Sequence, residues 1–377
     1  MRVHGPAGRL LAGFVTRMKL RGCASVGSSI SVAGRVWVHG GGHVHLGDGV
    51  VLDARAAPIE LCAHPGAEIR IGPAVRIEGG ASIEAVSHIE IEAEAKLGSF
   101  CKVLDNHLHQ LDSAHRHRRP PSHPVVVEQR AEVGARAILL PGARIGRGAV
   151  VPRGAVISRG FGVPPSRRIC GSEHEEVSAA RPAQSDGGDA SAQFVAAKIR
   201  AGMRILRAFW YLRHCQCGAR VRASGRVRVL NQGTIRVGDR TVFVGGMIPT
   251  ELICRPGGRI EIGPSSLLNY AVSVEAWDRV QIGSRTMFGS LVRMSDRANG
   301  RAGPIVIGDD VWVAHGAVIE PGVTIGSRSV IGAGSVVSSD VPPDSLALGN
   351  PARCMRLDFS SDERWNAAAT RPASVIG

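Results

Sequence analysis

Histidines and acidic residues gather in one short stretch of the chain, residues 104–124, which reads LDNHLHQLDSAHRHRRPPSHP. An imidazole titrates near neutral pH, so a histidine here can remove a proton from an attacking hydroxyl or amine. A carboxylate can hold one ring nitrogen so that the other faces the acceptor. Grouped histidines can also bind a metal ion, and an exposed loop of this composition can simply be solvated. The members of the group are His107, His109, His115, His117 and His123, with Asp105 and Asp112 beside them.

Small residues mark a second candidate region, residues 303–356, which reads GPIVIGDDVWVAHGAVIEPGVTIGSRSVIGAGSVVSSDVPPDSLALGNPARCMR. A long, thin ligand can lie against backbone amides only where no side chain stands in the way. Glycine and alanine at the bends of this segment would permit that contact. A tight coil needs the same small residues for its own geometry, so the bends alone favour a fold over a binding site.

Both regions belong to a chain whose aliphatic residues recur every six positions, a period of neither a helix nor a plain strand. In the first half these residues are Ile71, Ile77, Ile83, Ile89, Ile91, Leu97, Val103, Val127, Val133, Leu139, Ile145, Val151 and Ile157. In the second half they are Ile262, Leu268, Val274, Val280, Ile282, Phe288, Met294, Ile307, Val313, Ile319, Ile325, Ile331 and Val337.

The two halves are copies of one another. Ile71 and Ile262 are 191 positions apart, whereas Val127 and Ile307, which follow the histidine stretch, are 180 apart. The difference, 191 minus 180, means that the first copy carries 11 extra residues, and they fall inside residues 104–124. The chemistry of the first copy is therefore expected in that insertion.

A period of six fits a short strand followed by a turn, with one aliphatic side chain pointing inward. Three such strands close a triangular coil, and stacked coils pair strand on strand. We therefore expect an all-β fold of two tandem parallel β-helices, each with a short N-terminal helix. The second helix, residues 191–215, is expected to cap its β-helix through Val195, Ile199, Met203, Leu206 and Trp210, with attachment to a membrane surface as the alternative.

The expected domain boundaries follow from the repeats. The first unit covers residues 1–171, with its histidine loop at 104–124, and the second covers 191–359. Residues 172–190 are polar and rich in turn-forming residues, which indicates a linker, and residues 360–377 form a tail.

Composition narrows the choice of partners and compartment. The net charge of +14 suits nucleic acid, anionic lipid or a phosphate-rich cofactor, but the chain lacks a zinc-finger or RNA-binding signature, so we expect no nucleic acid. The eight cysteines are scattered through a long chain, and the N-terminal apolar stretch is too short for a signal peptide or a membrane span. These features predict a reduced, cytoplasmic protein, with peripheral membrane contact as a minor alternative.

Residues 303–356 closely resemble the C-terminal coils of hexapeptide-repeat acyltransferases. The matching motifs are IGDDVW, PGVTIG at 321–326, GAG at 332–334, VPP at 341–343 and GNPA at 349–352. The resemblance implies left-handed coils and an acyl-CoA co-substrate, with acetyl-CoA as the first expectation. The residues that it implies for cofactor binding are Gly142, Gly146, Trp312, Gly322, Gly326, Gly332, Ala333, Gly334, Asn350, Pro351, Ala352 and Arg353.

The histidine stretch resembles the catalytic loop of the sugar-modifying members of the same superfamily. Carried over residue by residue, this resemblance puts the general base on His109, with His107 as the fallback. Asp105 or Asp112 would then orient the imidazole. The implied reaction is a direct transfer of the acyl group to a hydroxyl or amine of a sugar or similar small acceptor.

Each copy departs from the family pattern in one part. The first copy has Glu132 where the second has Trp312, and it lacks the GAG and GNPA motifs, whereas the second copy has SDRANGRAG, without histidine, at residues 295–303. Family members are commonly trimers with sites between subunits. We therefore expect a homotrimer, with either a composite site built from His109 of one copy and the groove of the other, or a reactive first copy and a structural second copy.

Two other functions stay open at this point. One is a non-catalytic β-helix scaffold or binding protein, since a fold does not dictate a function. The other is a zinc protein like the β-helix carbonic anhydrases, which would require further histidines at fixed rungs on the flat faces of the coil. Because no such spacing is found in the sequence, no metal is expected.

Overall fold

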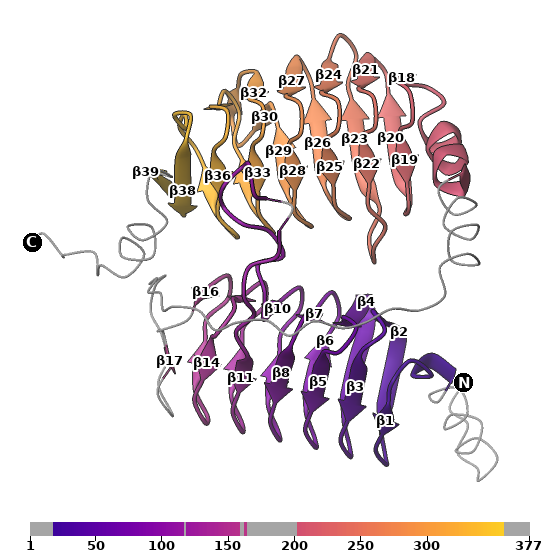
Figure 1. Cartoon of the computed structure of the whole chain (residues 1–377), viewed down its shortest axis with the longest axis vertical. Coiled ribbons are helices and arrows are strands. Elements are labelled where there is room, and N and C mark those ends of the chain that lie inside the picture. Colours follow the sequence, from indigo (N-terminus) through magenta and orange to yellow (C-terminus); the bar gives the residue numbers. More distant parts are fainter. Residues whose placement is uncertain (1–17, 117, 159–161, 164–201, 358–377) are drawn as a thin grey trace, which may run out of the picture. The chain divides into compact units, whose positions relative to one another are not determined.

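The computed structural model describes residues 18–116, 118–158, 162–163 and 202–357. The chain forms two compact units, one containing strands β1 to β17 and the other β18 to β39. In each unit short strands of successive coils stack side by side along the axis of a solenoid (Figure 1). The expected all-β fold of two parallel β-helices is confirmed.

The first unit contains two sheets of parallel strands. One has the order β1 (Ser25–Val26), β3 (His43–Leu46), β5 (Glu68–Ile71), β8 (His88–Ile91), β11 (Val125–Val127), β14 (Arg144–Ile145) and β17 (Gly162–Val163). The other has the order β15 (Val150–Val151), β12 (Glu132–Val133), β9 (Lys96–Leu97), β6 (Arg76–Glu78), β4 (Val51–Ala63), β7 (Ser82–Ala85), β10 (Lys102–Leu104), β13 (Ile138–Leu139) and β16 (Val156–Ile157), with β2 (Ser31–His39) paired to β4. Because β4 is long enough to pair with β6 and then with β7, it joins two faces of the coil into one sheet.

The second unit keeps its three faces as separate sheets. The first is β18 (Gln216–Cys217), β21 (Thr234–Val237), β24 (Arg259–Ile262), β27 (Arg279–Ile282), β32 (Ile305–Ile307) and β35 (Thr324–Ile325). The second is β19 (Arg222–Ala223), β22 (Val242–Phe243), β25 (Leu267–Leu268), β28 (Met287–Phe288), β33 (Trp312–Val313), β36 (Val330–Ile331), β38 (Ser345–Gly349) and β39 (Ala352–Arg356). The third is β20 (Val227–Asn231), β23 (Thr250–Cys254), β26 (Ser273–Ala276), β29 (Arg293–Ser295), β34 (Val318–Ile319) and β37 (Val336–Val337), and β30 (Arg297–Ala298) forms a small hairpin with β31 (Arg301–Ala302).

The six-residue period corresponds to the interior of each coil. Every aliphatic position that the period selects, in both copies, is at most 3% exposed. Strand register stacks these side chains directly, as in the pairing of Ile71 with Ile91 and of Val127 with Ile145. Each unit therefore has one continuous aliphatic core along its axis.

The duplication is visible in the register. Ile89 pairs with Val125 across the histidine loop, and Val280 pairs with Ile305 at the corresponding place in the second unit. The partners before the loop differ by 191 and those after it by 180, as the sequence offsets require. The extra residues of the first copy therefore leave the coil without shifting the rungs on either side of them.

A helix at residues 202–211 closes one end of the second unit, but with a different face from the one expected. Ala208 and Leu212 are each 2% exposed and belong to the aliphatic core. Met203, Leu206 and Trp210, which were expected to make this contact, are 52%, 68% and 66% exposed. The small Ala208 side chain lets the backbone approach the end of the core, so the helix is rotated relative to its apolar stripe.

Several expectations fall outside the described residues. These are most of the first helix (residues 10–17), the linker (172–190), the start of the second helix (191–201), the tail (360–377) and His117. Within the described part of the chain, no helix is long and apolar enough to cross a membrane.

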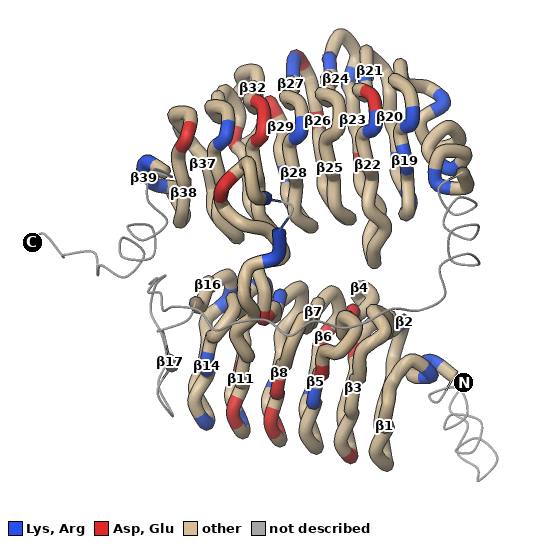
Figure 2. Tube along the Cα trace, viewed as in Figure 1, with Lys and Arg blue, Asp and Glu red and all other residues tan. Residues whose placement is uncertain are grey.

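Charged side chains of opposite sign pair from rung to rung on the outside of both units. Basic and acidic residues are interleaved over the surface of each solenoid (Figure 2). One such pair is Lys96 with Glu132 at 2.6 Å, and another is Arg328 with Asp344 at 2.6 Å. Each exposed pair of this kind contributes little to the free energy of unfolding, but it neutralises opposite charges on adjacent rungs.

Candidate active site

The histidine loop leaves the coil between β10 and β11, and Asn106 holds its two ends together. The Asn106 amide nitrogen donates hydrogen bonds to the Pro120 carbonyl (2.7 Å) and to the Ser122 hydroxyl (2.9 Å). Its amide oxygen accepts one from the Leu108 backbone nitrogen at 2.6 Å. Asn106 is 1% exposed, so this brace is internal to the loop. It closes the 11-residue insertion into a defined shape.

His109 is half-buried in this loop, and its tautomer follows from one contact. Nδ1 lies 3.0 Å from the backbone carbonyl oxygen of Arg116, and since a carbonyl can only accept, Nδ1 donates. The lone pair of the neutral ring is then on Nε2. Burial lowers the pKa of His109 below its usual value of 6.5, and the nearby Arg116 and Arg119 charges act in the same direction. The ring is therefore neutral near pH 7, as a general base must be.

Asp105 does not have the orienting role that was considered for it. Its carboxylate accepts hydrogen bonds from the backbone nitrogens of Val86, Ser87 and His88, each at 2.7 Å, and the residue is 0% exposed. In the second unit Asp296 accepts from three consecutive backbone nitrogens in the same way. The second copy has no histidine loop and still keeps this arrangement, so the three backbone hydrogen bonds belong to the coil. The residue that orients His109 is instead Arg116, through its peptide carbonyl.

The remaining acidic and imidazole candidates of the loop lie on either side of His109. His107 is exposed, and Asp112 is half-buried three residues after His109. The backbone nitrogen of His123, at the end of the loop, donates to the Asp105 carbonyl at 2.8 Å. A catalytic role for His107 or Asp112 stays a prediction.

The PGARIG turn of the first copy lies against the end of the histidine loop. Gly142 has a φ of +82°, a conformation that favours glycine, and its backbone nitrogen donates to the His123 carbonyl at 3.0 Å. Gly146 is buried and directly follows β14 (Arg144–Ile145). One of the predicted cofactor-binding residues, Gly142, is thus brought beside the loop that carries His109.

The corresponding turns of the second unit exclude larger side chains. A Cβ atom on Gly332 would lie 2.1 Å from Cδ2 of Leu348, and one on Gly326 would lie 2.3 Å from the backbone nitrogen of Pro343. Backbone packing therefore requires a glycine at position 326, whereas a larger residue at 332 would only have to displace the end of the half-buried Leu348 side chain. Gly322 differs, since it is exposed with a φ of +82° and a Cβ there would meet nothing closer than 4.0 Å.

The other predicted groove residues of the second unit lie at its surface. Ala333 and Gly334 are half-buried at one turn, and Trp312 is half-buried in β33. The GNPA motif forms the tip of the β38–β39 hairpin, where Gly349 pairs with Ala352 and the bond between Asn350 and Pro351 is cis. Asn350, Pro351 and Arg353 are exposed there, and Ala352 is half-buried.

His315, the histidine of the second copy within this region, is part of a turn. Its Nδ1 lies 2.8 Å from the hydroxyl of Ser290 on the neighbouring rung, and its carbonyl accepts from the Gly334 nitrogen at 2.8 Å. These contacts tie His315 to the neighbouring rungs of the coil.

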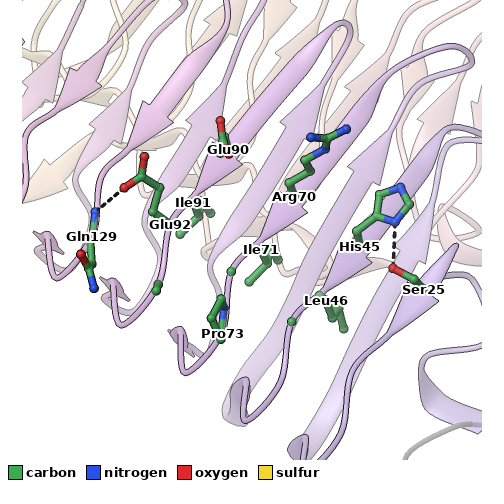
Figure 3. Close-up of a pocket in the computed structure, with 13 residues that line it drawn as sticks. Ser25, His45, Leu46, Arg70, Ile71, Pro73, Glu90, Ile91, Glu92 and Gln129 are labelled. Atoms are coloured by element: carbon green, nitrogen blue, oxygen red, sulfur yellow. Dashed lines mark hydrogen bonds between the residues drawn. The ribbon is translucent and has the colours of Figure 1, made fainter.

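A shallow groove elsewhere on the first unit follows the sheet of β3, β5 and β8 (Figure 3). In it the hydroxyl of Ser25 lies 2.8 Å from Nδ1 of His45, and the Gln129 backbone nitrogen donates to Glu92 at 2.9 Å. The second unit has a groove at the equivalent rungs, with Arg236 in the place of His45. A hollow that recurs with different polar residues reflects the shape of the coil and not a specific site.

Sequence reasoning located the loop but missed the residues that shape it. Asn106 adjoins the candidate histidines, yet its partners Pro120 and Ser122 follow the histidine run, so only the folded loop reveals the brace. The use of a backbone carbonyl to orient His109 has no signature in the residue types.

Two family models match the chain, one in each copy. A model described as bacterial transferase hexapeptide (six repeats) matches residues 304–339, and one described as hexapeptide repeat of succinyl-transferase matches residues 124–159. The two ranges are 180 positions apart, which is the offset between the copies after the histidine stretch.

Similar proteins carry acetyltransferase names. The galactoside O-acetyltransferase of Escherichia coli (strain K12) is 39% identical over 120 residues, which are 29% of this chain and 59% of that protein. A protein of Staphylococcus aureus (strain COL) named as an acetyltransferase is 57% identical over 56 residues, 15% of this chain and 28% of its own length. The chain therefore spans less than two thirds of each of these relatives.

Solved structures of the same kind are also similar. A hexapeptide-repeat acetyltransferase of Vibrio cholerae, solved with acetyl coenzyme A, is 28% identical with a TM-score of 0.27 and covers 44% of this chain and 90% of its own. A maltose O-acetyltransferase of Clostridium difficile is 26% identical with a TM-score of 0.27, covering 43% and 87%. Hexapeptide-repeat models thus match both copies of the duplication, and the similar sequences carry acetyltransferase names.

Proposed function

We propose that this protein transfers an acyl group, with acetyl as the first candidate, from coenzyme A to a hydroxyl or amine of a sugar-like acceptor. The observation that supports the proposal most is the state of His109. Its Nδ1 donates to a fixed carbonyl and its pKa is lowered, which leaves Nε2 as a base at neutral pH. The galactoside acceptor of the Escherichia coli relative favours a sugar hydroxyl.

The proposed reaction is a direct transfer. The acceptor oxygen or nitrogen attacks the thioester carbonyl carbon while Nε2 of His109 takes its proton. The tetrahedral intermediate then collapses, the carbon–sulfur bond breaks, and the thiolate of coenzyme A leaves with the proton that His109 held. The Arg116 carbonyl keeps the ring oriented and stabilises its transient positive charge.

Acyl-CoA binding is proposed for the glycine-floored turns. In the first copy these turns contain Gly142, which adjoins the histidine loop, and Gly146. In the second copy they run from Trp312 to the GNPA hairpin tip, where exposed Asn350 and Arg353 suit a phosphate-bearing nucleotide. Since the base is in one copy and the fuller groove in the other, we propose that complete sites form in a homotrimer.

The test is mass spectrometry of acceptors incubated with the full chain and acetyl-CoA. A panel of galactosides, maltose, amino sugars and nucleotide sugars covers both hydroxyl and amine acceptors. The proposal expects one acceptor class to gain an acetyl group and coenzyme A to be released in equal amount. A chain that neither acylates any acceptor nor hydrolyses any acyl-CoA from acetyl to succinyl would be a scaffold.

A further inference from the structure

A polar cluster covers the outer face of the first unit where β4 and β7 pair. Cys62 on β4 is directly opposite Glu84 on β7, and His64 follows β4 by one residue. His64 Nε2 donates to Glu84 Oε1 at 3.2 Å, and both His64 and His39 hydrogen-bond the Cys62 thiol. One ligand-type atom from each of Cys62, His64 and Glu84 lies within 4.8 Å of the others.

These side chains are partly withdrawn from water. Cys62 is 6% exposed, and the side chains of His64 and Glu84 are 22% and 20% exposed. On the protein side, Lys102 Nζ donates to Glu84 Oε2 at 2.8 Å and to the Ser82 hydroxyl at 2.9 Å. Lys102 and Ser82 thus cover one side of the group, while His64 and Glu84 remain partly exposed to solvent.

The second unit gives an internal comparison at the same rungs. Ile253 and Glu275 pair there as Cys62 and Glu84 do, 191 positions later. Arg255 replaces His64 and forms an ion pair with Glu275 at 2.8 Å. The coil thus accepts an ordinary ion pair at this place, and the first copy has a thiol and an imidazole that the fold does not require.

We propose that Cys62, His64 and Glu84 bind a zinc ion. Sulfur, nitrogen and carboxylate oxygen are the ligand types that Zn²⁺ takes, and three protein ligands leave a fourth position for water or another small ligand.

Binding changes two contacts that the structure contains. The ion replaces the hydrogen that His64 Nε2 shares with Glu84, so the metal and this hydrogen bond exclude each other. The exposed Arg119 guanidinium, 3.5 Å from His64 Nδ1, turns away into solvent. His39, hydrogen-bonded to the thiol and to Glu60, remains as an outer partner of the bound sulfur. This site goes beyond the proposed acyl transfer and departs from the expectation that the chain binds no metal.

The test uses the full chain, kept reduced with a phosphine, stripped with a chelator and titrated with Co²⁺ and then Zn²⁺. We expect about one ion per chain, with thiolate-to-cobalt charge-transfer absorption that Zn²⁺ removes. Cys62→Ser should abolish this absorption and weaken Zn²⁺ binding by about 100-fold or more. Loss of an outer partner such as His39 typically weakens metal binding by only about 10–100-fold.

A variant that copies the residues of the second unit serves as the control for correct folding. Cys62→Ile with His64→Arg introduces residues that already pack at these rungs, and it should keep the thermal unfolding transition while losing the metal. Cys254→Ala, which removes a buried thiol of the second unit, should bind cobalt as the unchanged chain does. Absence of stoichiometric binding by the unchanged chain would overturn the proposal, as would cobalt absorption that persists in the Ile/Arg variant.

Discussion

His109 combines a fixed tautomer with partial burial, and both come from its own loop. The Arg116 carbonyl takes the Nδ1 hydrogen, and the surrounding loop removes water that would favour the charged ring. A histidine on an open, solvated loop would have neither property. The chemistry that we assign to the chain therefore depends on how residues 104–124 fold back on themselves.

The lowered pKa of His109 has a consequence for the pH dependence of catalysis. The active form is the neutral ring, which is lost on protonation as the pH falls through the pKa of the folded protein. The acid limb of a plot of kcat/KM against pH should therefore have its midpoint below 6.5. A midpoint at or above that value, which would mean that the ring is fully solvated, speaks against His109 as the base.

Asp105 should matter for stability and not for chemistry. Asp105→Ala removes the acceptor of three backbone hydrogen bonds, and we expect a loss of about 3 kcal/mol in the free energy of unfolding of the first unit. Asp296→Ala is the matched change in the second unit and should have a similar effect there. Denaturant unfolding measures both. Normal stability with abolished turnover in Asp105→Ala would return this residue to the catalytic group.

At the scale of the elements, the helix at residues 202–211 seals the second core through one face only. Leu212→Ala empties a position that is 2% exposed, so the free energy of unfolding should fall by about 2–5 kcal/mol. Leu206→Ala, at a position that is 68% exposed, should change it by no more than about 0.5 kcal/mol. Thermal melting of the two variants compares the faces, and a larger effect at Leu206 would mean that the apolar stripe is the buried one.

The period-six pattern determined the coils because each rung presents one side chain inward, whatever the rest of the fold does. Ile77 and Val274 could thus be placed in the core from spacing alone, and both are 0% exposed. The helix phase could not be predicted in this way, since several apolar stripes are possible and the small Ala208 decided which one packs. To predict a contact between residues one coil apart, such as that of His64 with Glu84, the number of residues in each coil must be known as well as the period of six.

At the scale of the whole molecule, we propose that the duplication separated the catalytic base from the acyl-CoA groove. The first copy keeps the histidine loop and the second keeps the turns of the hexapeptide groove, while both keep the core and the aspartate that caps three backbone amides. Shared features therefore belong to the fold. Features found in one copy are the candidates for function.

The proposal of complete sites in a trimer can be tested by mixing chains. His109→Ala removes the base, and Ala333→Tyr places a large side chain at a half-buried position of the proposed acyl-CoA groove. Each variant alone should be inactive, and co-expressed chains with different tags should recover part of the activity in the doubly tagged fraction. Native mass spectrometry gives the oligomeric state of that fraction. Inactivity of a mixed trimer would show that base and groove must be on the same chain.

The most direct test of the account is the turnover of His109→Ala with acetyl-CoA and the acceptor identified from the panel. If His109 is the general base, kcat should fall by about 10²–10⁴-fold, while the melting temperature and the affinity for acetyl-CoA stay unchanged. His107→Ala tests the fallback base, and its kcat should fall far less than that of His109→Ala if His109 is the base. A His109→Ala chain that is folded, binds acetyl-CoA and turns over at the rate of the unchanged protein would contradict the account.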